Sequence, residues 1–112
     1  MQTVEQNKRA AVRNEVRTTA TIFCDCGAGW QILRGWTDDI SSSGMKVRTE
    51  REIRRLSVYV RMAMPGVTDK LFSAKVVREQ YGSDMRALFT YGLQFTGVCD
   101  DEFAKKVFAK QG

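Results

Sequence analysis

Most of this chain alternates apolar with polar residues in short runs, and this alternation limits its fold more than any other feature. Such runs favour β-strands, because neighbouring side chains of a strand point to opposite faces. The runs are residues 16–25, 30–37, 45–48, 56–64, 71–79 and 86–95. Turn-forming residues separate them: Asp38 and Asp39 are predicted to end the second run, and Pro65 and Gly66 the fourth. About six strands without helices between them predict an all-β antiparallel sandwich or small barrel.

The hydrophobic pattern becomes helical near the end of the chain. Asp100 or Asp101 can act as the N-cap of a helix. Apolar side chains then repeat at helical spacing at Phe103, Val107 and Phe108. We therefore expect a helix over about residues 99–110 that packs its phenylalanine side chains against the strands.

Length and composition agree with a single domain. With 112 residues, of which 43% are hydrophobic, the chain can bury one modest core. No linker, low-complexity segment or internal repeat divides it. We expect a flexible basic arm over residues 1–14, followed by one β-barrel domain with its helix over residues 15–112.

Several function classes lack the residues that they need. The chain has no histidine, the commonest general base, and no Walker-type loop or nucleophile elbow. Its three cysteines form neither a disulfide framework nor a zinc motif, which favours reduced thiols in a cytoplasmic protein. No apolar run could span a membrane, and we expect no secretory signal. The sequence predicts a binding module, not an enzyme, that uses no metal or cofactor.

An Asp-x-Ser-x-x-Gly sequence, formed by Asp39, Ser41 and Gly44, carries the strongest chemical signal. The carboxylate can accept hydrogen bonds from a guanine edge, the hydroxyl can bond a base or a phosphate, and the glycine lets a ligand approach the backbone. Arg9 and Arg13 lie upstream and can bind phosphate or guanine through two parallel hydrogen bonds. Together these residues predict a site for a guanine nucleotide with more than one phosphate charge.

A second pair of arginines has the same spacing as Arg9 and Arg13. The spacing that joins Arg9 to Arg13 also joins Arg13 to Arg17. We prefer the first pair because the strand pattern begins at Val16, which places Arg17 on a strand. Lys8 and Arg17 are possible additional ligand contacts.

Three segments resemble the PilZ domain, a family of bacterial receptors for cyclic di-GMP. They are Arg-Ala-Ala-Val-Arg at residues 9–13, Asp-Ile-Ser-Ser-Ser-Gly at residues 39–44 and Tyr-Gly-Leu-Gln-Phe at residues 91–95. They occur in the family's order, the third resembles its last barrel strand, and a charged helix follows. The resemblance runs from about residue 8 to residue 110 and implies a six-stranded antiparallel PilZ-type barrel with a C-terminal α-helix.

This resemblance implies a receptor or adaptor for cyclic di-GMP. Arg9 and Arg13 would grip phosphates and stack on or bond guanine. Asp39 and Ser41 would bond guanine edges, and Gly44 would admit the ligand to the backbone. Ligand binding would order the arm and present a changed surface to a downstream protein effector.

Other interpretations stay open. Asp39, Ser41 and Gly44 could form only an Asx-type turn that closes a hairpin. An OB-like barrel that binds single-stranded nucleic acid belongs to a different class, but it needs clustered exposed aromatic side chains, and those of this chain are dispersed. Trp30 and Trp36 could stack on bases, although we expect both in the core or a hairpin. A PilZ-like adaptor could also act without nucleotide. The net charge of +5 suits an anionic ligand without choosing one.

Overall fold

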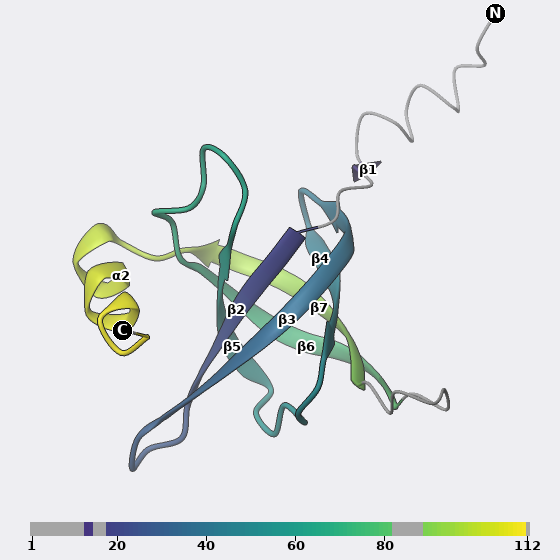
Figure 1. Ribbon diagram of the computed structural model, residues 1–112, viewed down its shortest axis with the longest axis horizontal. Coiled ribbons are helices and arrows are strands. Elements are labelled where there is room, and N and C mark those ends of the chain that lie inside the picture. The colour runs from purple at the N-terminus through teal and green to yellow at the C-terminus, as the bar shows by residue number, and fades with distance from the viewer. Residues whose placement is uncertain (1–12, 15–17, 82–88, 112) are drawn as a thin grey trace, which may run out of the picture.

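The computed structural model of the chain describes residues 13–14, 18–81 and 89–111. Within these residues, six antiparallel strands form a closed barrel, and one helix follows the last strand (Figure 1). The barrel strands are β2 (Thr18–Asp25), β3 (Trp30–Ser41), β4 (Gly44–Thr49), β5 (Ser57–Met62), β6 (Phe72–Tyr81) and β7 (Phe89–Val98). The six-stranded antiparallel barrel with a C-terminal helix that the sequence predicts is confirmed.

The barrel consists of two three-stranded meanders that join along both edges. β2, β3 and β4 pair in sequence to form the first, and β5, β6 and β7 form the second. β2 then pairs with β5, and β4 pairs with β7, which closes the sheet on itself. The β4–β7 ladder runs from Gly44 opposite Gln94 to Thr49 opposite Phe89.

A two-residue strand, β1 (Arg13–Asn14), adds to this sheet beside the end of β3. Arg13 pairs with Ser41, and Asn14 pairs with Ile40. Because Ile40 also pairs with Met45 of β4, the last residues of β3 lie between β1 and β4. Residues 1–12 of the expected arm lie outside the described residues.

Apolar side chains from all six strands fill the barrel. The alternation is clearest in β4, where Met45, Val47 and Thr49 are buried while Lys46 and Arg48 are exposed. Inward residues of the other strands complete the core, among them Ile22, Cys24, Leu33, Val58, Val60, Tyr91 and Leu93. The two-residue period of the sequence therefore reports which side chains face the barrel interior.

The helix α2 (Asp101–Phe108) packs against the barrel on the side away from β1 (Figure 1). A carboxylate oxygen of Asp100 accepts a hydrogen bond from the Phe103 N–H at 2.8 Å, which confirms Asp100 as the N-cap. The buried face of the helix belongs to a second apolar cluster, formed by Phe23, Leu71, Ala104 and Val107. This packing covers one side of the barrel with apolar contacts.

β3 continues past the aspartates that were predicted to end it, so that prediction is wrong. The strand runs on to Ser41 because a β-bulge between Thr37 and Asp39 absorbs one residue. At the bulge, the Thr37 hydroxyl accepts a hydrogen bond from the Asp39 N–H at 3.3 Å. The side-chain hydroxyl thus takes the place of a ladder partner and lets the strand resume.

The hydroxyl of Tyr91 ties the connection between β4 and β5 to β7. It accepts a hydrogen bond from the Ile53 N–H at 2.8 Å, and both residues are buried. Burial raises the pKa of Tyr91, and the hydrogen bond from Ile53 opposes that shift. The hydroxyl is therefore a neutral, fixed partner for a backbone donor that has no access to water.

Replacing Tyr91 with phenylalanine should destabilise the protein by about 1–3 kcal/mol, because the Ile53 N–H would lose its partner in a buried site. The free energy of unfolding from urea denaturation measures the effect. Tyr59→Phe is the control: this ring is half-buried, and in the described structure its hydroxyl makes no hydrogen bond, so the loss should stay below about 0.5 kcal/mol. Equal losses in the two variants would contradict this role of Tyr91.

Candidate functional site

The Asp-x-Ser-x-x-Gly sequence forms the hairpin between β3 and β4. Ser41 ends β3, Gly44 begins β4, and two serines make the loop between them. The Ser41 hydroxyl accepts a hydrogen bond from the Ser43 N–H at 3.3 Å and lies 3.4 Å from the Gly44 carbonyl oxygen, to which it can donate. It also lies 3.1 Å from the Ser43 hydroxyl, and either oxygen of this pair can be the donor. The Ser41 hydroxyl therefore helps to hold the turn, as the turn-only interpretation predicts.

Gly44 is needed where the hairpin meets β7. A Cβ at this position would overlap the carbonyl oxygen of Leu93 and would lie 3.3 Å from the Cα of Gln94. In the described structure, positive φ angles among glycines occur at Gly27 and Gly66, so backbone conformation does not explain the glycine at position 44. The close approach of two strands gives this glycine a structural reason that is independent of any ligand.

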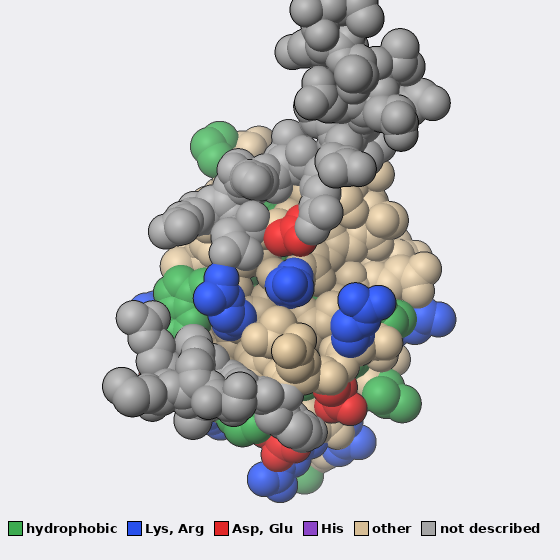
Figure 2. All heavy atoms as spheres, turned by 90° about the vertical axis from the view of Figure 1, so that its right-hand side faces the viewer, with side chains coloured by type: hydrophobic (Ala, Val, Ile, Leu, Met, Phe, Trp, Pro, Cys, Tyr) green, Lys and Arg blue, Asp and Glu red, His purple; other side chains and the backbone are tan. Residues whose placement is uncertain are grey.

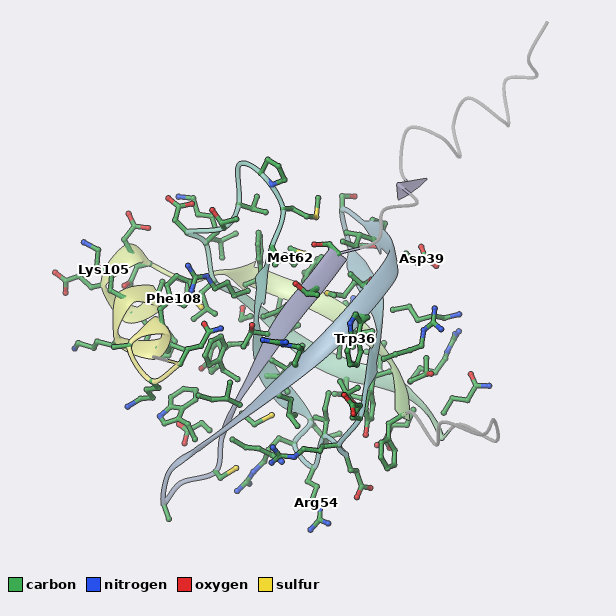
Figure 3. The ribbon with its side chains drawn as sticks, viewed as in Figure 1. Trp36, Asp39, Arg54, Met62, Lys105 and Phe108 are labelled. Carbon is green, nitrogen blue, oxygen red and sulfur yellow. The ribbon has the colours of Figure 1, made fainter. Side chains whose placement is uncertain are left out.

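An open groove of about 760 Å³ begins at the hairpin and crosses β4, β7 and β6. Asp39, Ser41 and Gly44 all line it, so the structure brings the three predicted residues of this sequence together on one surface. Figure 3 labels Asp39 at the end of the barrel remote from α2. Several Lys and Arg side chains lie on this side of the molecule (Figure 2). The volume lies within the range of about 300–1,000 Å³ that is common for ligand sites.

Comparison with models of known protein families identifies the family of this chain. A family model described as PilZ domain matches residues 7–107. The chain belongs to the PilZ family. No curated protein and no solved structure matches the chain significantly. The match extends over all six barrel strands and most of α2, and it includes the positions of Arg9 and Arg13.

Of the arginines predicted for the arm of this PilZ domain, only Arg13 has a described backbone position. It pairs with Ser41 in the β1–β3 ladder, so the second arginine of the preferred pair lies beside the hairpin. The other predicted arm contacts, Lys8, Arg9 and Arg17, lie outside the described residues. The structure therefore supports a place for Arg13 next to the groove, and the roles of the other three stay predictions.

Sequence reasoning missed several residues that line the groove of the PilZ domain. Lys46 follows the hairpin on β4, whereas Arg78 and Gln94 come from β6 and β7. Lys46 and Arg78 belong to none of the three motif segments, because strand pairing alone brings them together. Gln94 does lie in the Tyr-Gly-Leu-Gln-Phe segment, which indicated a barrel strand and no ligand contact. The alternation of β4 could have indicated that Lys46 faces outward beside Gly44.

The aromatic residues do not form a platform for stacked bases in the described parts of the chain. The ring of Trp30 lies 5.9 Å from that of Tyr59, which in turn lies 5.2 Å from Phe103 of α2. Trp36 is 38% exposed on the barrel surface and pairs with Thr19 in the β2–β3 hairpin, in agreement with the expectation of a core or hairpin position (Figure 3). Most of these rings serve packing, which disfavours a barrel that binds single-stranded nucleic acid.

The described residues also offer little for metal or thiol chemistry. They contain no group of three or more His, Cys, Asp or Glu residues placed to hold a metal ion. Burial, together with the nearby Cys26, raises the pKa of Cys24 to about 11, and Arg55 opposes the shift. A thiol with that pKa stays protonated near pH 7 and is a poor nucleophile.

No described helix is long and apolar enough to cross a membrane.

Gly44→Ala should destabilise the protein by about 2–4 kcal/mol, because the added methyl group would push β4 away from the Leu93 carbonyl. Thermal and urea denaturation measure the loss. The matched control is Gly29→Ala, since a Cβ at Gly29 has no atom within 4 Å and this variant should stay near wild-type stability. Wild-type stability of Gly44→Ala would show that the two strands can separate without cost and would leave only a ligand-based reason for the glycine.

Proposed function

We propose that this PilZ domain is a cyclic di-GMP receptor that acts as an adaptor for a downstream protein. The observation that carries the proposal is the groove at the β3–β4 hairpin, where Asp39, Ser41 and Gly44 meet and beside which the backbone of Arg13 lies. Family membership supports the same ligand class. The net charge of +5 favours an anionic ligand.

Each residue of the hairpin has a distinct part in this proposal. The Asp39 carboxylate accepts hydrogen bonds from the N1–H and N2–H donors of a guanine, which adenine lacks. Ser41 exchanges a hydrogen bond within the turn for one to a guanine edge or a phosphate oxygen. Gly44 keeps the hairpin against β7, so its backbone groups face the ligand from a fixed position.

Arg9 and Arg13 supply the positive charge at the other side of the ligand. A guanidinium group binds two phosphate oxygens at once, or the O6 and N7 atoms of guanine, and can also stack on a base. Arg13 begins next to Ser41, so its charge and the hairpin can act on the same nucleotide. A carboxylate and arginines on one ligand select a molecule that is both a guanine and a phosphodiester.

Signal output follows from the link between the arm and the ligand. A ligand that binds better when the arm covers the groove shifts the population toward that arrangement by its difference in affinity. The surface made by the arm and the groove then differs between the free and bound states, and a partner protein can read that difference. This function requires binding alone and no catalytic step.

Cyclic di-GMP should bind at least about tenfold more tightly than cyclic di-AMP or GTP, because only the guanine edge matches Asp39 and only the cyclic dinucleotide has two phosphodiesters. Asp39→Ala should weaken binding by about ten- to a hundredfold, whereas Asp69→Ala, an exposed carboxylate in the β5–β6 connection, should have no effect. Isothermal titration calorimetry gives both affinity and stoichiometry. Equal affinities for the three nucleotides, or tight oligonucleotide binding unaffected by Asp39→Ala, would contradict the receptor function and favour the nucleic-acid alternative.

The arm is tested by three alanine variants. Arg9→Ala and Arg13→Ala should each weaken cyclic di-GMP binding by about ten- to a hundredfold with little effect on folding stability, since this segment has few apolar residues. Arg17→Ala should cost less, and hydrogen exchange should slow over residues 8–14 when the ligand is added. If only Arg17→Ala impairs binding, the arginine register is shifted by four residues. If neither Arg9→Ala nor Arg13→Ala has an effect, the arm is not part of the site.

A further inference from the structure

Two cations that belong to none of the three motif segments, Lys46 and Arg78, line the groove. Lys46 of β4 pairs with Gly92 of β7, and Gly92 pairs in turn with Arg78 of β6. The three residues thus form one lateral row across adjacent strands, and all three line the groove. Two strand spacings separate the backbones of Lys46 and Arg78, a distance of about 10 Å.

The residue between the two cations has no side chain. A Cβ on Gly92 would lie 3.2 Å from the Cβ of Arg78 and 4.0 Å from a methyl group of Val77. Gly92 has no positive φ, so its backbone conformation does not demand glycine. The missing side chain instead leaves the floor of the groove bare between Lys46 and Arg78, where another molecule can approach the backbone of β7.

Neither cation is neutralised within the described structure. Lys46 and Arg78 are both exposed, and no ion pair or side-chain hydrogen bond of either occurs among the described residues. Neighbouring basic residues differ from them: Arg48 has an interaction partner, and Lys75 does not line the groove. Two unpaired cations that flank a bare strand form a local site for an anion.

The same lateral row reaches the Asp-x-Ser-x-x-Gly hairpin. Asp39 of β3 pairs with Lys46, so a carboxylate lies at one end of the row and Arg78 at the other. Val77, 57% exposed, adds an apolar surface next to Arg78 on the groove. A ligand that places a guanine edge at Asp39 would therefore extend a phosphate, and then a second base, over Gly92.

We propose that Lys46 and Arg78 form a second phosphate-binding pair, so that cyclic di-GMP lies across β4, β7 and β6 as well as between the hairpin and the arm. This inference rests on the proposed function and specifies how the barrel itself recognises the ligand. The arm arginines bind one phosphodiester, and the barrel cations bind the other. A mononucleotide can satisfy only one of these pairs, which explains why the site would prefer a dinucleotide.

The test compares Lys46→Ala, Arg78→Ala and the double variant with Lys105→Ala, which removes an equal charge from α2 on the far side of the barrel (Figure 3). Calorimetric titration with cyclic di-GMP should show about five- to twentyfold weaker binding for each groove variant and no change for Lys105→Ala. The loss should shrink as salt is added, because screening weakens the same attraction in the wild type. Lys46→Arg and Arg78→Lys keep the charge and should stay within about threefold of the wild type.

A second readout separates a ligand contact from a structural effect. Thermal unfolding of the groove variants should match that of the wild type, since both side chains are exposed. GMP, which has one phosphate, should lose less affinity than cyclic di-GMP in the double variant. If the double variant binds cyclic di-GMP like the wild type while Asp39→Ala does not, this inference is wrong and the receptor function stands. If the wild type binds no cyclic di-GMP, both are wrong.

Discussion

The pairing of β4 with β7 is the constraint on which both the barrel and its candidate site depend. It joins the two meanders, and it brings Gly44 so close to the Leu93 carbonyl that no side chain fits between them. The Ser43 carbonyl extends the contact by accepting a hydrogen bond from the Phe95 N–H at 2.8 Å. The contact that closes the barrel therefore also fixes the hairpin, and folding positions the groups of the turn that line the groove.

The two sides of the barrel differ in the side chains that they present. On the helix side, the Arg61 guanidinium lies 4.0 Å from the centre of the Phe108 ring, and its Nε donates to the Thr68 carbonyl at 2.7 Å. Aromatic and cation–π contacts hold α2 in place there. The groove side is open and carries the charged side chains of Asp39, Lys46 and Arg78 on its lining.

Local sequence signals predicted the elements well, because each depends on residues close together in the chain. The strands follow from alternation, and the N-cap at Asp100 follows from its position before an apolar repeat. The expected end of β3 was wrong because the Thr37 hydroxyl supplies a partner that residue propensities do not include. The meeting of Lys46 and Arg78 on one groove depends on which strands become neighbours, and alternation alone does not specify that order.

Two β-bulges decide which charges reach the groove. Without the bulge between Thr37 and Asp39, the register would place Asp39 opposite Met45, whose side chain is buried in the core; with it, Asp39 pairs with the exposed Lys46. The irregularity between Val76 and Arg78 acts in the same way, since a regular strand would pair Arg78 with the buried Tyr91 instead of Gly92. A single extra residue in each strand thus turns a charge from the barrel interior to the groove. A sequence motif marks the hairpin between β3 and β4. The rest of the groove lining depends on the pairing register of the strands, which only the folded sheet defines.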